Sequence, residues 1–289
     1  MVKWWLGGAM ALLLAGLGHA QNMAHNGFLH VTFRIYGANS SGTCFLVNHG
    51  KKTYLVTAAH VLEGIKEKEC KVAFRRNRLD NEGNLIAQRQ DLPVQVRDND
   101  KPLWTKHPQA DVAVLPFSLP KGQSPSGEMA LEPFTLDQFL DDDFLKKGQG
   151  FYHTGQEVFI PCFPAKLESN PAGFPILRKG TIASSPLAPA KTIKTILLDI
   201  RTFGGDSGAP VILAPTGPAR ISKGGTPTTP GNRILGMSLG MVRQTDRTVS
   251  PFEERTVHTP LGLGIALPAV FLRETVEMAA RDKEASAKP

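Results

Sequence analysis

Three short motifs carry the residue types of a nucleophilic hydrolase. Residues 204–210 read Gly-Gly-Asp-Ser-Gly-Ala-Pro, and their glycines place Ser207 in a tight turn from which its hydroxyl can reach a substrate carbonyl. His60 ends the motif Thr-Ala-Ala-His, and Asp111 begins the motif Asp-Val-Ala-Val-Leu, each flanked by small or apolar residues. This combination of side chains predicts a serine hydrolase with Ser207 as the nucleophile.

Each of these residues has a distinct predicted role. A serine hydroxyl is a weak nucleophile at neutral pH, so it needs a base that takes its proton during attack. Histidine suits this task because its side chain titrates near neutral pH, so His60 is the predicted base. Asp111 is predicted to hold the imidazole in the correct tautomer. The amides of Gly205 and Ser207 are the predicted donors to the oxyanion that the attack creates.

The elements that must position these motifs are mostly β-strands. Short runs of alternating or β-branched residues predict strands in both halves of the chain. In the first half they cover residues 28–36, 44–48, 53–57, 71–74, 94–97 and 112–117, and in the second half residues 157–160, 176–183, 192–200, 209–213, 234–241 and 263–267. Residues 118–150 are rich in proline and glycine and contain an acidic run, which predicts a linker that can hold a short helix.

The second half also contains two predicted loops and ends in a predicted helix. Residues 215–232 are rich in proline and glycine, and residues 243–260 are polar and charged, so both are expected to be mobile surface excursions. Apolar residues recur at helical spacing among charged ones in residues 269–282, after a proline, which predicts an amphipathic helix.

The first 20 residues have the pattern of a secretory leader. An apolar stretch, residues 4–17, follows Lys3, and Gly18 and Ala20 are small residues at the positions that signal peptidase reads. We expect cleavage after Ala20 and export to the periplasm or the extracellular space. The apolar stretch is shorter than the roughly 20 residues that cross a bilayer, so no membrane span is expected once the leader is removed.

Charge and cysteine content limit the partners. The formal net charge is +7, from 33 Lys and Arg against 26 Asp and Glu, and removal of Lys3 with the leader lowers it to +6. Basic residues are scattered and not interleaved with aromatic ones, so no nucleic-acid partner is expected. Cys44, Cys70 and Cys162 permit one disulfide in any of three pairings, with Cys44 favoured, or remain buried thiols; their spacing predicts no metal site. The histidines other than His60 also lack metal-ligand spacing and are predicted to be surface or loop residues.

The three motifs, in the order His, Asp, Ser, together resemble the chymotrypsin-like, or trypsin-fold, serine proteases. The resemblance covers residues 28 to about 279 and implies an all-β fold of two six-stranded Greek-key barrels with a C-terminal helix. It divides one protease domain, residues 21–289, into a first barrel at about 28–117, a linker at 118–150, a second barrel at about 151–268 and the helix at 269–282. The implied activity is endopeptidase cleavage of proteins or peptides through an acyl-enzyme, without a cofactor, and the oligomeric state stays open.

Two departures from the family pattern imply its bacterial branch. No Ile-Val-Gly-Gly sequence begins the expected mature chain, so activation by a new N-terminus is not expected. Asp206, which receives that N-terminal amine in animal members, must find another partner or stay solvated. Val61 stands where many members have a disulfide-forming cysteine after the histidine. The chain is similar to the catalytic domains of the HtrA and glutamyl endopeptidase groups, without a PDZ module.

Four further positions match substrate-binding residues of the family. Arg201, six residues before Ser207, matches the base of the primary pocket, so a trypsin-like preference for basic residues is disfavoured. Thr202 resembles a threonine of the glutamyl endopeptidases, although Ser238 stands where those enzymes have a histidine. Arg201 could pair with a substrate carboxylate, or it could simply point to solvent. Ser238 and Gly240 match a Ser-x-Gly motif that pairs with an extended substrate backbone.

Two other functions share the same residues. A chain can keep all three motifs and yet be a silent binding protein, because its oxyanion turn is collapsed or its pocket is blocked. An esterase would use the same site on a different substrate. Irreversible reaction of Ser207 with a fluorophosphonate probe separates an active hydrolase from a binding module.

Overall fold

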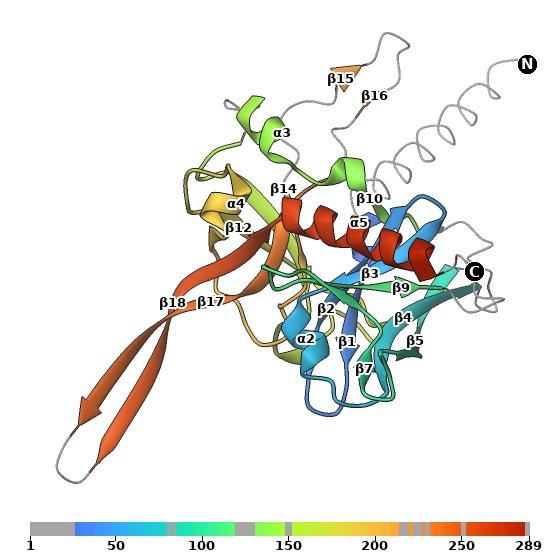
Figure 1. Cartoon of the computed structure of the whole chain (residues 1–289), viewed down its shortest axis with the longest axis horizontal. Coiled ribbons are helices and arrows are strands. Elements are labelled where there is room, and N and C mark those ends of the chain that lie inside the picture. The colour runs from blue at the N-terminus through green and yellow to red at the C-terminus, as the bar shows by residue number, and fades with distance from the viewer. Residues whose placement is uncertain are drawn as a thin grey trace, which may run out of the picture.

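Most of the predicted catalytic domain is described by the computed structural model. The described residues are 27–79, 82, 85–118, 131–147, 152–213, 220–221, 227–228, 232–249 and 253–286. The predicted leader with its cleavage site lies outside the described residues, as do parts of the predicted linker and most of the predicted loop 215–232. Within the described residues the fold is all-β, as predicted, with a long helix at the end of the chain (Figure 1).

The first half of the chain forms one eight-stranded sheet. Its main path runs β5-β4-β1-β2-β3-β9-β8 with antiparallel neighbours, and β10 pairs with β2 in parallel. The strands are β1 (Thr32–Tyr36), β2 (Ser41–His49), β3 (Lys52–Thr57), β4 (Glu69–Leu79), β5 (Leu85–Gln95), β8 (Thr105–Lys106), β9 (Ala113–Phe117) and β10 (Phe134–Thr135), beside the small pair β6 (Arg97–Asp98) and β7 (Lys101–Pro102). The path ends at the two-residue strand β8, so strand pairing does not join the two ends in the described residues.

The second half forms a closed six-stranded barrel. Its order is β11-β12-β13-β18-β17-β14. The strands are β11 (Glu157–Cys162), β12 (Ile176–Ile182), β13 (Ile196–Asp199), β14 (Pro210–Leu213), β17 (Arg233–Val249) and β18 (Glu254–Pro268), and a separate pair is formed by β15 (Arg220–Ile221) and β16 (Pro227–Thr228). Alternate apolar side chains fill the barrel, among them Ile160, Ile182, Leu198 and Val211, all almost fully buried. This burial of one strand face explains the alternating sequence pattern.

Helices are few, and one of them ties the halves together. They are α2 (Ala59–Glu63), α3 (Asp142–Lys147), α4 (Ala190–Ile193), α5 (Ala269–Ser286) and the 3-10 turns η1 (Leu136–Gln138) and η2 (Pro164–Lys166). Although α5 follows the second barrel, its apolar residues Phe271, Leu272 and Val276 join the core of the first sheet. Figure 1 shows α5 lying beside β3 and β9. Because this face is buried against the first sheet while the chain enters α5 from β18 of the barrel, the helix connects the two halves. Within the described residues, no helix is long and apolar enough to cross a membrane.

The segment 243–260 is not the loop that its polar sequence predicts. β17 and β18 continue pairing out to Val249 opposite Glu254, and Figure 1 shows them as a long ribbon projecting from the barrel. Threonine and valine residues recur along both strands of this ribbon, and their β-branched side chains favour extended backbone. The prediction was wrong because charge was given more weight than this β-propensity.

Buried polar and sulfur side chains give two further corrections. Cys44, Cys70 and Cys162 are all free and buried, so the favoured disulfide of Cys44 is not formed and the alternative of buried thiols holds. His107 is also buried, not at the surface as predicted: its Nε2 lies 3.2 Å from a carboxylate oxygen of Glu274 in α5. Its ring also packs edge-on against Phe271, with the ring centroids 5.3 Å apart.

Candidate active site

His60 and Asp111 are brought together by one pair of neighbouring strands. Thr57 at the end of β3 lies opposite Ala113 at the start of β9. His60 lies in α2, three residues after the end of β3, and Asp111 lies two residues before the start of β9. Both side chains are therefore at the same end of this strand pair. His60 Nδ1 lies 2.6 Å from Asp111 Oδ2, and the His60 amide donates to Asp111 Oδ1 at 2.9 Å. These two contacts fix both the position of the carboxylate and the orientation of the imidazole.

The electrostatics of this pair favour an ionised aspartate. Partial burial raises the pKa of Asp111. Hydrogen bonds from the His60 ring and amide, together with the charges of His60 and Lys106, lower the pKa by more than burial raises it. The net result is a pKa below the usual range for an aspartate. An ionised Asp111 accepts the Nδ1 proton of His60, which leaves Nε2 as the ring nitrogen that can take a proton from a nucleophile.

The turn that carries Ser207 needs glycine at two positions. Gly205 has φ +102° and Gly208 has φ +92°, which side chains rarely adopt. A Cβ atom on Gly205 would collide with the Phe163 carbonyl, and one on Gly208 would collide with the Thr43 carbonyl. The glycines therefore allow the main chain of both halves to approach this turn closely. It is called the nucleophile turn here, after the predicted role of Ser207.

The first sheet holds the nucleophile turn directly. Thr43, in β2, donates its amide to the Ser207 carbonyl at 2.8 Å and its hydroxyl to the Gly205 carbonyl at 2.7 Å. The Thr57 hydroxyl in turn donates to the Thr43 carbonyl at 2.7 Å. These buried hydrogen bonds join β3, β2 and the Ser207 turn. Because Thr57 ends β3 three residues before His60, they also link the serine turn to the segment that carries the histidine.

The Ser207 hydroxyl donates its hydrogen bond to the Leu239 carbonyl, at 2.7 Å. Among the described residues, Ser207 and His60 are not hydrogen-bonded to each other. Catalytic hydrogen bonds are often long before a substrate is bound. A proton could pass from Ser207 to His60 only after a movement of the serine side chain or of the imidazole.

The carboxylate of Asp206 is paired with Arg178 of the same chain. Its side chain is almost completely buried, and Oδ2 accepts from Arg178 Nη1 at 2.9 Å and from the Phe203 amide at 2.8 Å. Burial raises the pKa of Asp206, and the Phe203 amide, the Cys162 thiol and the Arg178 charge offset only part of that effect. Arg178 lies in β12 and also donates to the Arg201 carbonyl, so it holds the start of the nucleophile turn at two points.

The four predicted substrate-binding residues differ in their surroundings. The Arg201 side chain is exposed, and its guanidinium lies 5.4 Å from the centre of the Phe203 ring. Thr202 is buried and donates its hydroxyl to the Gly240 carbonyl at 2.8 Å. The Ser238 side chain is only 1% exposed. The backbone of Ser238 pairs with the nucleophile turn through Gly208 and Ala209.

Three residues at this site were missed by sequence reasoning. The Leu239 carbonyl, not a group of Ser238, faces the Ser207 hydroxyl, and no side-chain pattern marks a carbonyl. Arg178 stands beside Lys179 in a strand, with nothing in the sequence to single it out. Thr43 directly precedes the predicted strand 44–48, and a threonine between glycine and cysteine is a usable signal for an internal hydrogen bond.

A comparison with protein families agrees with this geometry. Residues 42–217, more than half of the chain, match the trypsin-like peptidase domain. The chain belongs to this family. Its enzyme class is therefore that of the serine endopeptidases, which are hydrolases. No curated protein matches the chain.

Several solved structures are similar to this chain at low sequence identity. The HtrA-type protease AlgW with tripeptide is 16% identical, with a TM-score of 0.49 over 90% of this chain and 62% of that chain. The serine endoprotease from Yersinia pestis is 16% identical, with a TM-score of 0.48 over 91% and 67%. Protease Anisep from Arthrobacter nicotinovorans is 13% identical, with a TM-score of 0.49 over 87% and 96%. The chain thus spans about three fifths of the length of the AlgW structure.

Proposed function

We propose that this protein is an exported serine endopeptidase whose nucleophile is Ser207. The observation that carries the proposal is the double hydrogen bond from Thr43 to the main chain at Gly205 and Ser207. It docks the nucleophile turn on the sheet that also pairs His60 with Asp111. Family membership supports a peptide bond as the bond that is cleaved.

The proposed reaction runs through an acyl-enzyme. Ser207 Oγ attacks the substrate carbonyl carbon while His60 Nε2 takes the hydroxyl proton, and the Gly205 and Ser207 amides stabilise the oxyanion. His60 then gives that proton to the leaving amine as the C–N bond breaks. A water molecule attacks the resulting ester with His60 again as the base, which releases the carboxylic acid and restores Ser207. Asp111 stays ionised throughout and stabilises the imidazolium.

An acidic side chain beside the scissile bond is the proposed preference. Support comes from Arg201, whose exposed guanidinium lies over the Phe203 ring close to the nucleophile turn. A guanidinium binds a carboxylate through charge-assisted hydrogen bonds. The test compares kcat/KM for peptides that differ only by Glu or Ala at this position: a preference for Glu that Arg201→Gln removes supports the proposal, and equal values contradict it.

One contact favours the silent alternative. The Ser207 hydroxyl is engaged by the Leu239 carbonyl, and a permanent engagement would keep it from His60. A binding protein of this kind would retain peptides without cleaving them. It would also leave a fluorophosphonate probe unreacted, because phosphonylation needs the same activated hydroxyl as acyl transfer.

The decisive experiment is labelling of residues 21–289 with a fluorophosphonate probe, followed by mass spectrometry of the modified peptide. We expect one adduct, on Ser207, that is absent from Ser207→Ala, together with hydrolysis of a casein substrate by the unmutated chain only. Absence of an adduct contradicts the proposal and favours the silent protein. An adduct with ester but no peptide hydrolysis favours the esterase.

Export is supported by the leader-like pattern of residues 1–20. Expression of the full chain in a Gram-negative host and fractionation of the cells tests it. We expect a product that begins at Gln21 in the periplasm or the medium. Retention of the uncut chain in the cytoplasm contradicts this part of the proposal.

A further inference from the structure

The segment between β11 and β12, residues 163–175, reaches the nucleophile turn and is called the bridging loop here. The Ala165 amide donates to the Gly204 carbonyl at 2.7 Å, and the Phe163 carbonyl lies against Gly205. A trans peptide group points its C=O and N–H in opposite directions. A Gly204 carbonyl that is held towards Ala165 therefore aims the Gly205 amide away from the bridging loop.

The contact with the turn depends on an unfavourable backbone. Ala165 and Lys166 have φ values of +51° and +68°, in the left-handed region that residues other than glycine rarely adopt. Such residues cost roughly 1 kcal/mol or more each and persist only where surrounding contacts hold them. The bridging loop thus needs support from outside its own backbone.

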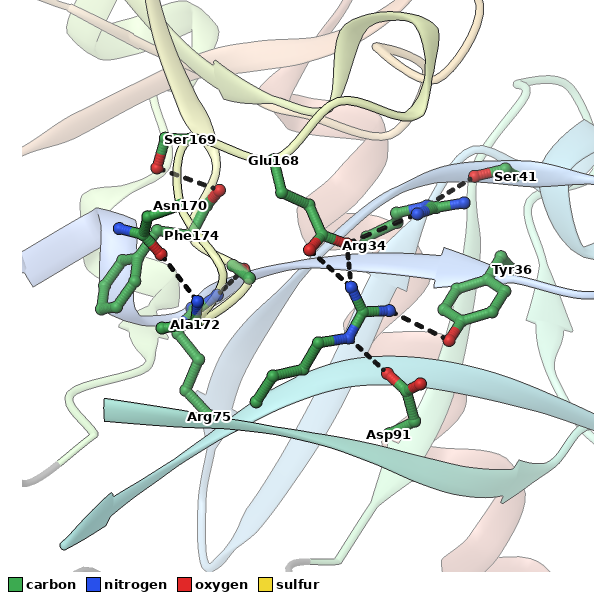
Figure 2. Close-up of polar contacts among 12 residues, drawn as sticks. Arg34, Tyr36, Ser41, Arg75, Asp91, Glu168, Ser169, Asn170, Ala172 and Phe174 are labelled. Carbon is green, nitrogen blue, oxygen red and sulfur yellow. Dashed lines mark hydrogen bonds and ion pairs between the residues drawn. The ribbon is translucent and has the colours of Figure 1, made fainter. Parts of the chain in front are cut away.

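That support comes from the first half of the molecule. Glu168, whose side chain is 13% exposed, lies with both carboxylate oxygens 2.5 Å from Arg89 Nη1 and with Oε1 3.4 Å from Arg34 Nη1 (Figure 2). Arg89 belongs to β5 and Arg34 to β1. Arg89 is itself fixed by Asp91 at 2.9 Å and by the Tyr36 hydroxyl at 3.1 Å. Glu168 therefore pins the bridging loop to a prearranged pair of arginines.

A second anchor lies at the far end of the bridging loop. Arg75, in β4, is buried and donates to the Gly173 carbonyl at 2.7 Å, while its guanidinium lies 4.4 Å from the centre of the Phe174 ring. Its other hydrogen bonds in the described residues go to main-chain carbonyls of residues 29, 30 and 32. A buried cation held only by neutral acceptors is costly compared with an apolar residue. Arg75 nevertheless links the bridging loop to the main chain of the first half, so it serves as a second anchor for the loop.

We propose that Glu168 is a positioning residue for catalysis: by clamping the bridging loop to Arg89 and Arg34, it keeps Ala165 on the Gly204 carbonyl and the Gly205 amide aimed at the oxyanion. This inference rests on the proposed function and deepens it. Glu168 acts through the bridging loop and needs no contact with substrate. Loss of the clamp frees the Gly204–Gly205 peptide group to rotate, which removes one oxyanion donor for part of the time.

The test compares two carboxylates that share Arg89. Glu168→Ala removes the partner on the bridging loop, whereas Asp91→Asn removes a partner within β5 and leaves the bridging loop attached. Loss of a whole oxyanion donor costs about 100-fold or more in kcat. For Glu168→Ala, which loosens a donor without deleting it, we expect kcat to fall about tenfold with KM within twofold, and the labelling rate of Ser207 to fall in proportion. Asp91→Asn, in which Tyr36 and Glu168 still hold Arg89, should change both far less than Glu168→Ala. Glu168→Gln, which keeps an acceptor oxygen, should recover most of the loss.

Hydrogen exchange provides a readout that does not depend on turnover. In Glu168→Ala the Ala165 amide should exchange faster, and in Asp91→Asn it should exchange as in the unmutated chain. Equal kcat and equal Ala165 exchange in Glu168→Ala and the unmutated chain overturn the positioning role while the proposed function stands. If Glu168→Ala does not fold, the same comparison is made with Glu168→Gln, for which unchanged exchange and kcat also overturn it. Failure of the unmutated chain to label at Ser207 is instead a failure of the proposed function.

Discussion

The two parts of the candidate active site are held in different ways. His60 and Asp111 are positioned by one antiparallel pair, β3 and β9, whose register alone sets them side by side. The Ser207 turn is positioned by long-range contacts from separate elements: Thr43 in β2, Arg178 in β12 and Ala165 in the bridging loop. The predicted base and carboxylate are thus positioned by sheet register, whereas the predicted nucleophile, Ser207, depends on tertiary contacts that converge on its turn.

This difference predicts where the site is vulnerable. Substitutions at the His60–Asp111 pair should remove chemistry and leave the fold, because both side chains are partly exposed at a sheet edge. Substitutions of residues that hold the turn should change stability and catalysis together. The following variants test that contrast.

The largest effect on rate is expected for Asp111→Asn. An asparagine keeps the shape but favours the wrong imidazole tautomer, and the corresponding change in a serine protease triad lowers kcat about 10⁴-fold. We expect a loss of this order in steady-state kinetics, with a thermal unfolding midpoint close to that of the unmutated chain. A large drop in the midpoint would mean that this pair, too, supports the fold.

Arg178→Met should affect both stability and rate. It leaves the buried carboxylate of Asp206 without its cation, and breaking a buried ion pair costs about 3–5 kcal/mol. We expect a loss of this size in urea unfolding and slower labelling of Ser207. Lys179→Met is the matched control, because Lys179 is the next residue in β12 but pairs with Glu157 at the surface; its effect should be small.

A smaller effect is expected for Thr43→Val. Valine keeps the shape of the side chain and removes the hydroxyl that binds the Gly205 carbonyl. Loss of one buried hydrogen bond costs about 1–3 kcal/mol. The free energy of unfolding should fall by this amount and kcat by several-fold, whereas Thr53→Val, which removes a partly exposed hydrogen bond to Asn48 far from the turn, should leave kcat unchanged.

The smallest effect at neutral pH is expected for His30, which contributes a pH dependence of stability only under acidic conditions. Burial, assisted by the charge of Arg75, lowers the pKa of His30 from 6.5 to about 4. The unfolded chain therefore binds a proton at His30 before the folded chain does, so the free energy of unfolding should fall as the pH drops from about 6.5 to 4. Urea unfolding of His30→Gln should show a shallower decline over this window than the unmutated chain. An identical decline would show that His30 does not contribute.

The features that could be predicted from the sequence are those that local residue patterns encode. The all-β class and the C-terminal helix follow from periodicity, and both are confirmed. The triad residues were chosen from three short motifs, and their assignment stays a prediction until Ser207 is tested. The ribbon of β17 and β18 was missed because its exposed strands carry charges on both faces and lack the alternation of a half-buried strand.

Tertiary support for the nucleophile turn could not be read from the sequence. Arg178 precedes Asp206 by 28 residues, and Glu168 is 79 residues from Arg89. Nothing local distinguishes these charged residues from solvated ones, because the barrel closure and the docking of the two halves bring them to their partners. His107 was misassigned for the same reason, since its partners Glu274 and Phe271 lie in α5, far along the chain.

We infer that residues within the chain align the Ser207 turn, with Arg178 bound to Asp206 in the place of a released N-terminal amine. The most direct test is the rate of fluorophosphonate labelling at Ser207 in residues 21–289 with a free N-terminus, in the same chain with an N-terminal extension, and in Arg178→Met. We predict equal rates for the first two and a much lower rate for Arg178→Met. Labelling only when the N-terminus is free, or an undiminished rate in Arg178→Met, would contradict the claim.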